Sequence, residues 1–137
     1  MKHHAAIILR DGNKVLFAQR AATKKSLPNI WAFPSGTMEE NESAEMTAVR
    51  EAKEELEITV TVEKNLSTVE LSQLGVALHL MVCTTDTPTQ INLDQEEIQK
   101  TSWMTFEEFF KTFTDEQVGH GLIYLRKHPE IWKAHFR

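Results

Sequence analysis

The chain of 137 residues contains one cysteine, Cys83, and no apolar run that approaches the roughly 20 residues needed to cross a bilayer. A single cysteine excludes an intrachain disulfide bond and a thiolate-rich zinc site. Residues 1–9 hold only a short apolar stretch, without the length or the small-residue cleavage site of a signal peptide. These absences, with 41% hydrophobic and 26% charged residues, predict a cytoplasmic protein that has no membrane partner.

The chain also lacks repeats, low-complexity tracts and a Pro/Gly/Ser-rich linker, so residues 1–137 are expected to form one domain. Strand-like and helix-like patterns intermix, which predicts an α/β or α+β fold with a mixed sheet. The expected strands are residues 5–10, 14–20, 30–33, 59–70 (one or two strands), 76–84 and 101–104. The expected helices are residues 44–56, 105–113 and 115–127. An Asp-Gly pair at 11–12 favours a tight hairpin between the first two strands.

Charge is placed unevenly along a chain whose net charge is −5. Residues 36–57 carry eight glutamates against one arginine and one lysine, whereas residues 1–35 carry six basic residues against one aspartate. An acidic centre beside a basic arm suits a small metal-bound polyphosphate. A nucleic-acid polymer would instead favour a basic stripe, so no such partner is expected.

Three glutamates of the helix expected over 44–56 share one face. Glu51, Glu54 and Glu55 are spaced i, i+3 and i+4, and Arg50 can offset only part of their mutual repulsion. Carboxylate oxygens gathered in this way are what Mg²⁺ or Mn²⁺ binds, although a solvated acidic helix face has the same spacing. The loop before the helix adds Gly36, which would let the backbone approach a metal closely.

Together these residues resemble the Nudix box, G-x5-E-x7-R-E-U-x-E-E-x-G-U, where U is aliphatic. The corresponding residues here are Gly36, Glu42, Arg50, Glu51, Ala52, Glu54, Glu55, Glu57 and Ile58. Ala52 is smaller than the usual aliphatic residue, and Glu57 replaces the glycine that ends the helix, which removes a favourable cap. The resemblance implies a Nudix-type α/β/α sandwich with a mixed sheet and a loop-helix-loop metal site.

The resemblance also implies roles for individual residues. The implied metal contacts are a backbone carbonyl of Ser35 or Gly36, Glu42 through a bound water, and the carboxylates of Glu51, Glu54, Glu55 and Glu97. Glu51 or Glu54 would take the proton of the attacking water, and Glu97 is a candidate base or ligand outside the box. Arg50 would pair with a box carboxylate and fix its rotamer. Arg20, Lys24 and Trp31 are the candidate contacts to the substrate.

The implied activity is that of a MutT-like hydrolase, which uses Mg²⁺ or Mn²⁺ to cleave a (deoxy)nucleoside triphosphate, including an oxidised one, into monophosphate and pyrophosphate. ADP-ribose, nucleotide sugars and dinucleoside polyphosphates are alternative substrates. An isoprenoid diphosphate isomerase would need a catalytic cysteine, for which Cys83 in an apolar strand is poorly placed. A non-catalytic nucleotide-binding module is the remaining alternative, and a homodimer through residues 124–136 is left open by analogy.

Overall fold

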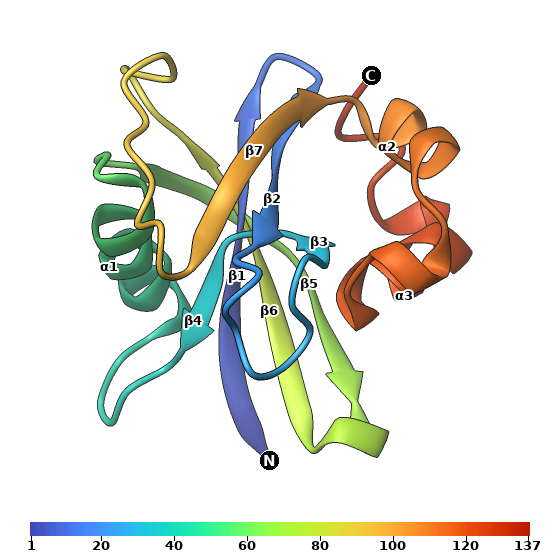
Figure 1. Cartoon of the computed structure of the whole chain (residues 1–137), viewed down its shortest axis with the longest axis horizontal. Helices are drawn as coiled ribbons and strands as arrows, with labels where there is room; N and C mark the ends of the chain where they lie inside the picture. The colour runs from blue at the N-terminus through green and yellow to red at the C-terminus, as the bar shows by residue number, and fades with distance from the viewer.

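A mixed β-sheet separates helix α1 from helices α2 and α3 in the computed structural model, which describes residues 1–137 (Figure 1). The strands are β1 (Lys2–Asp11), β2 (Lys14–Arg20), β3 (Trp31–Ala32), β4 (Ser35–Thr37), β5 (Thr61–Leu71), β6 (Val76–Thr84) and β7 (Ile98–Met104). The helices are α1 (Ala44–Leu56), α2 (Phe106–Thr112) and α3 (His120–Lys127), and short 3₁₀ turns cover Ser72–Leu74, Asp115–Gln117 and Pro129–Ile131. The predicted mixed α+β class is confirmed. None of the helices is long and apolar enough to cross a membrane.

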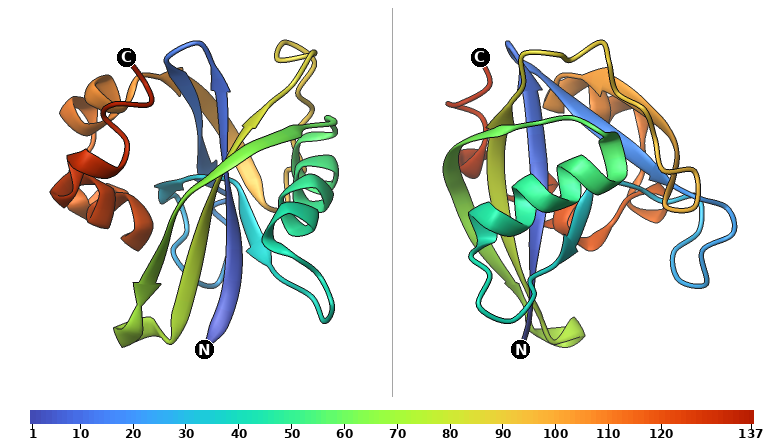
Figure 2. Two further views of the ribbon diagram at one scale, coloured as in Figure 1. Left: turned by 180° about the vertical axis from the view of Figure 1, so that it is seen from behind. Right: turned by 90° about the vertical axis from the view of Figure 1, so that its left-hand side faces the viewer.

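The strand order is β3-β2-β1-β6-β5, with β4 paired to β1 and β7 paired to β2. Strands β1 and β6 are parallel and all other pairs are antiparallel. The predicted hairpin joins β1 to β2 only at its closed end, where Arg10 lies opposite Val15. Beyond that end β1 pairs with β4 and β2 with β3 and β7, so the two halves of the sheet diverge, as the two views of Figure 2 show.

Both faces of the sheet are covered, which explains why residues 5–9 of β1 are all buried. Ile7 faces a core of small and aliphatic side chains beneath α1, and Ile8 faces an aromatic core beneath α2 and α3. In the aromatic core the rings of Phe17 and Phe109 stack with centroids 3.9 Å apart. Each fully buried side chain of this size contributes roughly 1.5–3 kcal/mol.

Helix α1 is fixed at both ends. Ser43 Oγ accepts a hydrogen bond from the backbone N–H of Met46 at 3.1 Å, which caps the first turn. Ala52 is fully buried, so the small residue in the box allows the helix to pack closely on the sheet. The last turn ends at Glu57 with φ 53° and ψ 38°, a left-handed conformation that costs a non-glycine residue about 1–2 kcal/mol. The Asn92 side chain donates a hydrogen bond to the Glu57 carboxylate there.

Three features of the structure differ from what the sequence predicts. Residues 115–127 do not form one helix, because Val118 leaves the 3₁₀ turn to bridge to Trp31 and α3 begins only at His120. Strand β4 was not expected, and β7 begins at Ile98 instead of residue 101. Residues 61–71 form one long strand with two register shifts, which agrees with the prediction of one or two strands over residues 59–70.

Candidate active site

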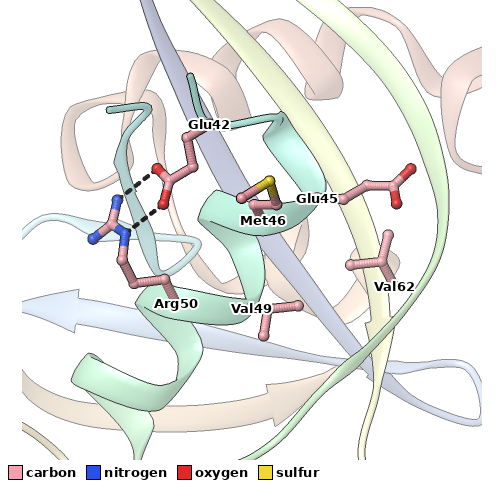
Figure 3. A pocket seen from close by; sticks show the side chains of 6 residues that line it. All are labelled: Glu42, Glu45, Met46, Val49, Arg50 and Val62. Carbon is pink, nitrogen blue, oxygen red and sulfur yellow. Dashed lines mark hydrogen bonds and ion pairs between the residues drawn. The ribbon is translucent and has the colours of Figure 1, made fainter. Parts of the chain in front are cut away.

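One guanidinium organises the carboxylates of α1. Arg50 Nε and Nη2 donate to the two oxygens of Glu42 at 2.7 and 3.0 Å, the pair drawn in Figure 3. Arg50 Nη1 donates to Glu51 at 2.9 Å and to Glu54 at 3.2 Å, and Nη2 also reaches the carbonyl of Thr37 at 3.1 Å. These bonds, above all those to Glu42, raise the pKa of the guanidinium, so it stays charged and offsets repulsion among the glutamates.

Glu42 is an anchor for this arrangement. Its carboxylate also accepts from Thr47 Oγ1 at 2.7 Å and from the backbone N–H of Glu39 at 3.0 Å, and only 9% of its side chain is exposed. The hydrogen bonds from Arg50, followed by the backbone bond and the Thr47 hydroxyl, lower its pKa to about 2. Glu42 is therefore ionised and fully engaged, and it orients Arg50.

A polar pocket of about 370 Å³ opens between α1, β4 and the loop before β7. Its lining residues are His4, Arg20, Ser35, Gly36, Thr37, Glu51, Glu54, Glu55, Asp94 and Glu97. The structure thus brings together nearly all residues that the sequence predicted for a metal site, with Glu42 just outside. Three lining residues were not predicted: Thr37, Asp94 and His4, whose pKa is lowered mainly by burial. Thr37 directly follows Gly36 of the box, whereas His4 and Asp94 lie in no local motif and only the tertiary fold brings them to the pocket.

Glu55 is the most unusual group in this pocket. It is 7% exposed, and its Oε2 atom is buried without a hydrogen-bond partner. Burial, followed by the nearby charges of Glu51, Glu97 and Asp94, raises its pKa to about 8. Burial likewise raises the pKa of Glu51, although Arg50 opposes the shift. A buried carboxylate without a partner among other carboxylates is the donor set that a cation would satisfy.

The close packing of β4 against α1 depends on Gly36. A Cβ atom at this position would overlap the carboxylate of Glu51, so any larger residue would push that side chain aside. Strand β4 holds the glycine in place through its pairing with β1, where Gly36 lies opposite Ala5. The backbone of Ser35 and Gly36 therefore lies beside the glutamates, as the loop-helix-loop expectation requires.

Lys24, in the loop over 21–29, and Arg20, just before this loop, already have hydrogen-bond partners. Lys24 Nζ donates to Glu97 Oε2 at 2.8 Å, which places a positive charge at the rim of the acidic pocket. Arg20 Nε donates to the carbonyls of Ser26 and Leu27, both at 3.2 Å, and Nη2 donates to Ser26 at 2.9 Å. Arg20 lines the pocket, but most of its hydrogen bonds hold the loop.

The structure does not place Trp31 at the pocket. Its side chain belongs to the aromatic core, with the residue 8% exposed and its ring 5.0 Å from that of Phe113. It lines neither the acidic pocket nor the neighbouring apolar one. The expectation that Trp31 contacts the substrate is therefore not supported, because the strand alternation turns its ring toward α2.

No three acidic or histidine side chains form a preformed metal cluster in this structure. The carboxylates of Glu51 and Glu54 both turn toward Arg50, which accounts for the open arrangement. The residues present fit a divalent cation because they supply hard oxygen donors and lack thiolates.

Comparison with known proteins identifies the family. Residues 1–124 match the NUDIX domain, so the chain belongs to the Nudix hydrolase family, as the sequence predicted. It is 41% identical over 76 residues to the CTP pyrophosphohydrolase of Escherichia coli (strain K12), covering 56% of this chain and 55% of that protein. It is 36% identical over 59 residues to the 8-oxo-dGTP diphosphatase of Proteus vulgaris, covering 43% and 53%. The alignments thus span about half the length of these two relatives.

The fold is shared with solved structures. A MutT protein from Methanosarcina mazei Go1 superposes with a TM-score of 0.76 at 17% identity, covering 99% of this chain and 96% of that one. This likeness confirms the Nudix-type arrangement of a mixed sheet between helical layers.

Proposed function

We propose that this protein is a divalent-cation-dependent pyrophosphohydrolase that cleaves a nucleoside triphosphate into a monophosphate and pyrophosphate. The observation that carries the proposal is the buried, unpartnered carboxylate of Glu55 among the carboxylates of Glu51, Glu54, Glu97 and Asp94. The names of the two curated relatives, which act on CTP and 8-oxo-dGTP, support a nucleoside triphosphate as substrate.

The proposed ligands of Mg²⁺ or Mn²⁺ are the carboxylates of Glu51, Glu55 and Glu97 with the backbone of Ser35 or Gly36. When bound, the ion would neutralise charge on phosphate oxygens and lower the pKa of a coordinated water.

Glu54 is the proposed proton acceptor. Its side chain is 57% exposed and meets Arg50 through one oxygen at 3.2 Å, so the other oxygen is free to take a proton from a water in the pocket. Glu51 is 13% exposed and is held by Arg50 at 2.9 Å, which suits a fixed ligand better than a base. Arg50, held by Glu42, would keep both carboxylates in position.

Lys24 and Arg20 place the positive charge that the triphosphate requires at the rim of the pocket. Lys24 pairs with Glu97 at 2.8 Å, and a phosphate that displaces this contact would free Glu97 to approach the ion. The proposed reaction therefore needs no group beyond the pocket, the ion and a water.

The test follows pyrophosphate release from canonical and oxidised nucleoside triphosphates, with and without EDTA. We expect activity that requires Mg²⁺ or Mn²⁺, and a fall in kcat of roughly 10²-fold or more in Glu54→Gln. Glu45→Gln is the matched control, because Glu45 is an exposed acid in the first turn of the same helix. It should retain the wild-type rate.

Four outcomes would overturn the proposal or parts of it. Full activity in EDTA would refute the requirement for a divalent cation. Full activity of Glu54→Gln would refute the role of Glu54 as the proton acceptor. Release of two monophosphates from ADP-ribose, with no cleavage of triphosphates, would support hydrolysis of a pyrophosphate bond but refute a nucleoside triphosphate as the substrate. Binding of triphosphates without turnover would indicate a nucleotide-binding module.

A further inference from the structure

An apolar pocket of about 200 Å³ adjoins the acidic pocket on the α3 side of the sheet. The two pockets share Arg20 and Ser35. A smaller recess, lined by Ala32 and Phe33 as well as Glu55 and Glu97, lies between them. A molecule with a charged end and a flat apolar end could therefore occupy both pockets at once.

One wall of the apolar pocket is unusual. Leu27 lines it, yet this leucine is 46% exposed, and its backbone has φ 49° in the left-handed region. A β-carbon is strained in that conformation, and a large apolar side chain gains nothing from facing water. The position thus combines two unfavourable features in a residue that borders a pocket.

The loop around Leu27 is nevertheless held firmly. Arg20 donates to the carbonyls of Ser26 and Leu27, and the side chain of Gln19 donates to the carbonyl of Asn29 at 3.0 Å. Gln99 Nε2 adds bonds to both Gln19 and Asn29 at 2.9 Å. These contacts fix the loop on β2 and β7, so the leucine is held at the mouth of the pocket by its neighbours.

The opposite wall comes from the start of α3. The pocket is lined there by Gly119, His120, Gly121 and Leu122. A Cβ on Gly121 would lie 2.6 Å from the Leu78 side chain, so this turn packs tightly against β6. The pocket therefore has one wall fixed on the sheet and one wall made by the exposed leucine.

We propose that Leu27 is a substrate-positioning residue that covers the face of the nucleobase in the apolar pocket while the phosphates occupy the acidic pocket. The inference rests on the proposed function. A bound base would bury the leucine side chain, so ligand binding offsets the exposure that the free protein tolerates. Arg20 acts through the loop, since its hydrogen bonds position Leu27.

The test compares Leu27→Gly with Asn41→Gly. Asn41 has φ 65° in the exposed loop before α1, so glycine adopts the backbone conformation at both positions without strain, and asparagine tolerates it better than leucine does. We expect Leu27→Gly to raise KM for the triphosphate roughly tenfold with little change in kcat. Inhibition by pyrophosphate, which has no base, should be unchanged, and Asn41→Gly should leave all three values at wild type.

The outcomes separate this inference from the proposed function. An unchanged KM in Leu27→Gly, or an equal loss of pyrophosphate inhibition, would overturn the role of the leucine. If the wild type hydrolyses no triphosphate, the proposed function is wrong. The role of Leu27 in binding the nucleobase can then still be tested by calorimetry with nucleoside monophosphates in EDTA. Weaker binding by Leu27→Gly than by Asn41→Gly would then support the inference on its own, and equal binding would overturn it.

Discussion

Replacement of Glu55 by glutamine should stabilise the metal-free protein. Glutamine keeps the shape of the side chain but carries no charge, so it removes the unfavourable burial of a carboxylate that lacks a partner. The pKa of Glu55 is raised from 4.5 to about 8 in the folded chain, so the folded state holds its proton more tightly than the unfolded state. Wild-type stability is therefore lost as the pH rises from about 4.5 to about 8.

The magnitude follows from these two pKa values. At pH 7 the unfolded carboxyl is ionised and the folded one is mostly protonated, which costs the wild type about 3 kcal/mol at ~1.4 kcal/mol per pH unit above 4.5. Glu55→Gln avoids this loss. In a chain of this length, a gain of about 3 kcal/mol corresponds to a rise in melting temperature of roughly 10 °C.

The assay is thermal and urea unfolding followed by circular dichroism, in EDTA, at pH 7 and at pH 4.5. The stabilisation should be large at pH 7 and should almost vanish near pH 4.5, where the folded carboxyl is protonated and the unfolded one is half protonated. Added Mg²⁺ should stabilise the wild type and not Glu55→Gln. Glu45→Gln, an exposed change on the same helix, should shift stability by less than about 0.5 kcal/mol. A Glu55→Gln variant no more stable than wild type at pH 7 would refute the view that this carboxylate is unsatisfied.

Three further predictions concern other positions. Gly36→Ala should lower the rate of pyrophosphate release at least tenfold, because the added methyl group displaces the Glu51 carboxylate, and an unchanged rate would contradict the packing argument. Glu57→Gly should raise the free energy of unfolding by about 1 kcal/mol in urea titrations, because glycine is unstrained at φ 53°; a loss of stability would show that the Glu57 side chain contributes more than the strain. Burial lowers the pKa of both His4 and His79 below 6.5, so the contribution of these two histidines to the free energy of unfolding should fall as the pH drops from 7 to 5, opposite in sign to that of Glu55. His79→Gln lacks one of these contributions, so its stability relative to the wild type in urea titrations should rise from pH 7 to pH 5, and a constant difference across that range would count against it.

Local patterns predicted the main elements of the fold. The hairpin signal at Asp11–Gly12 and the helical spacing over 44–56 depend on neighbours in sequence, and both elements form as expected. Strand β4 was missed because three residues beside a proline carry no periodicity, and the strand exists only through its pairing with β1. The expected long helix after residue 115 failed for a similar reason, since Val118 bridges to Trp31 from a distant part of the chain.

In the candidate site too, the sequence predicts what depends on local spacing and misses what depends on distant contacts. The spacing of Glu51, Glu54 and Glu55 placed all three on one helix face, and the structure lines one pocket with them. Spacing could not show that Glu55 alone is buried, because burial is set by the sheet beneath the helix and by the loop that carries Asp94, whose backbone N–H donates to the carbonyl of Glu55 at 3.0 Å. Nor could it show that the ring of Trp31 turns into the core.

The guanidinium of Arg50 also affects the order in which the chain would fold and bind metal. Because one cation internal to the chain already holds Glu42, Glu51 and Glu54, the helix does not need an external ion to overcome its own repulsion during folding. The chain is therefore expected to reach its native state in the absence of metal, and an ion bound at the proposed site would be loaded afterwards. Metal could then be exchanged, or withheld in a cell depleted of it, without exposing the chain to unfolding or proteolysis. This separates the protein from small zinc domains, in which loss of the metal is also loss of the fold.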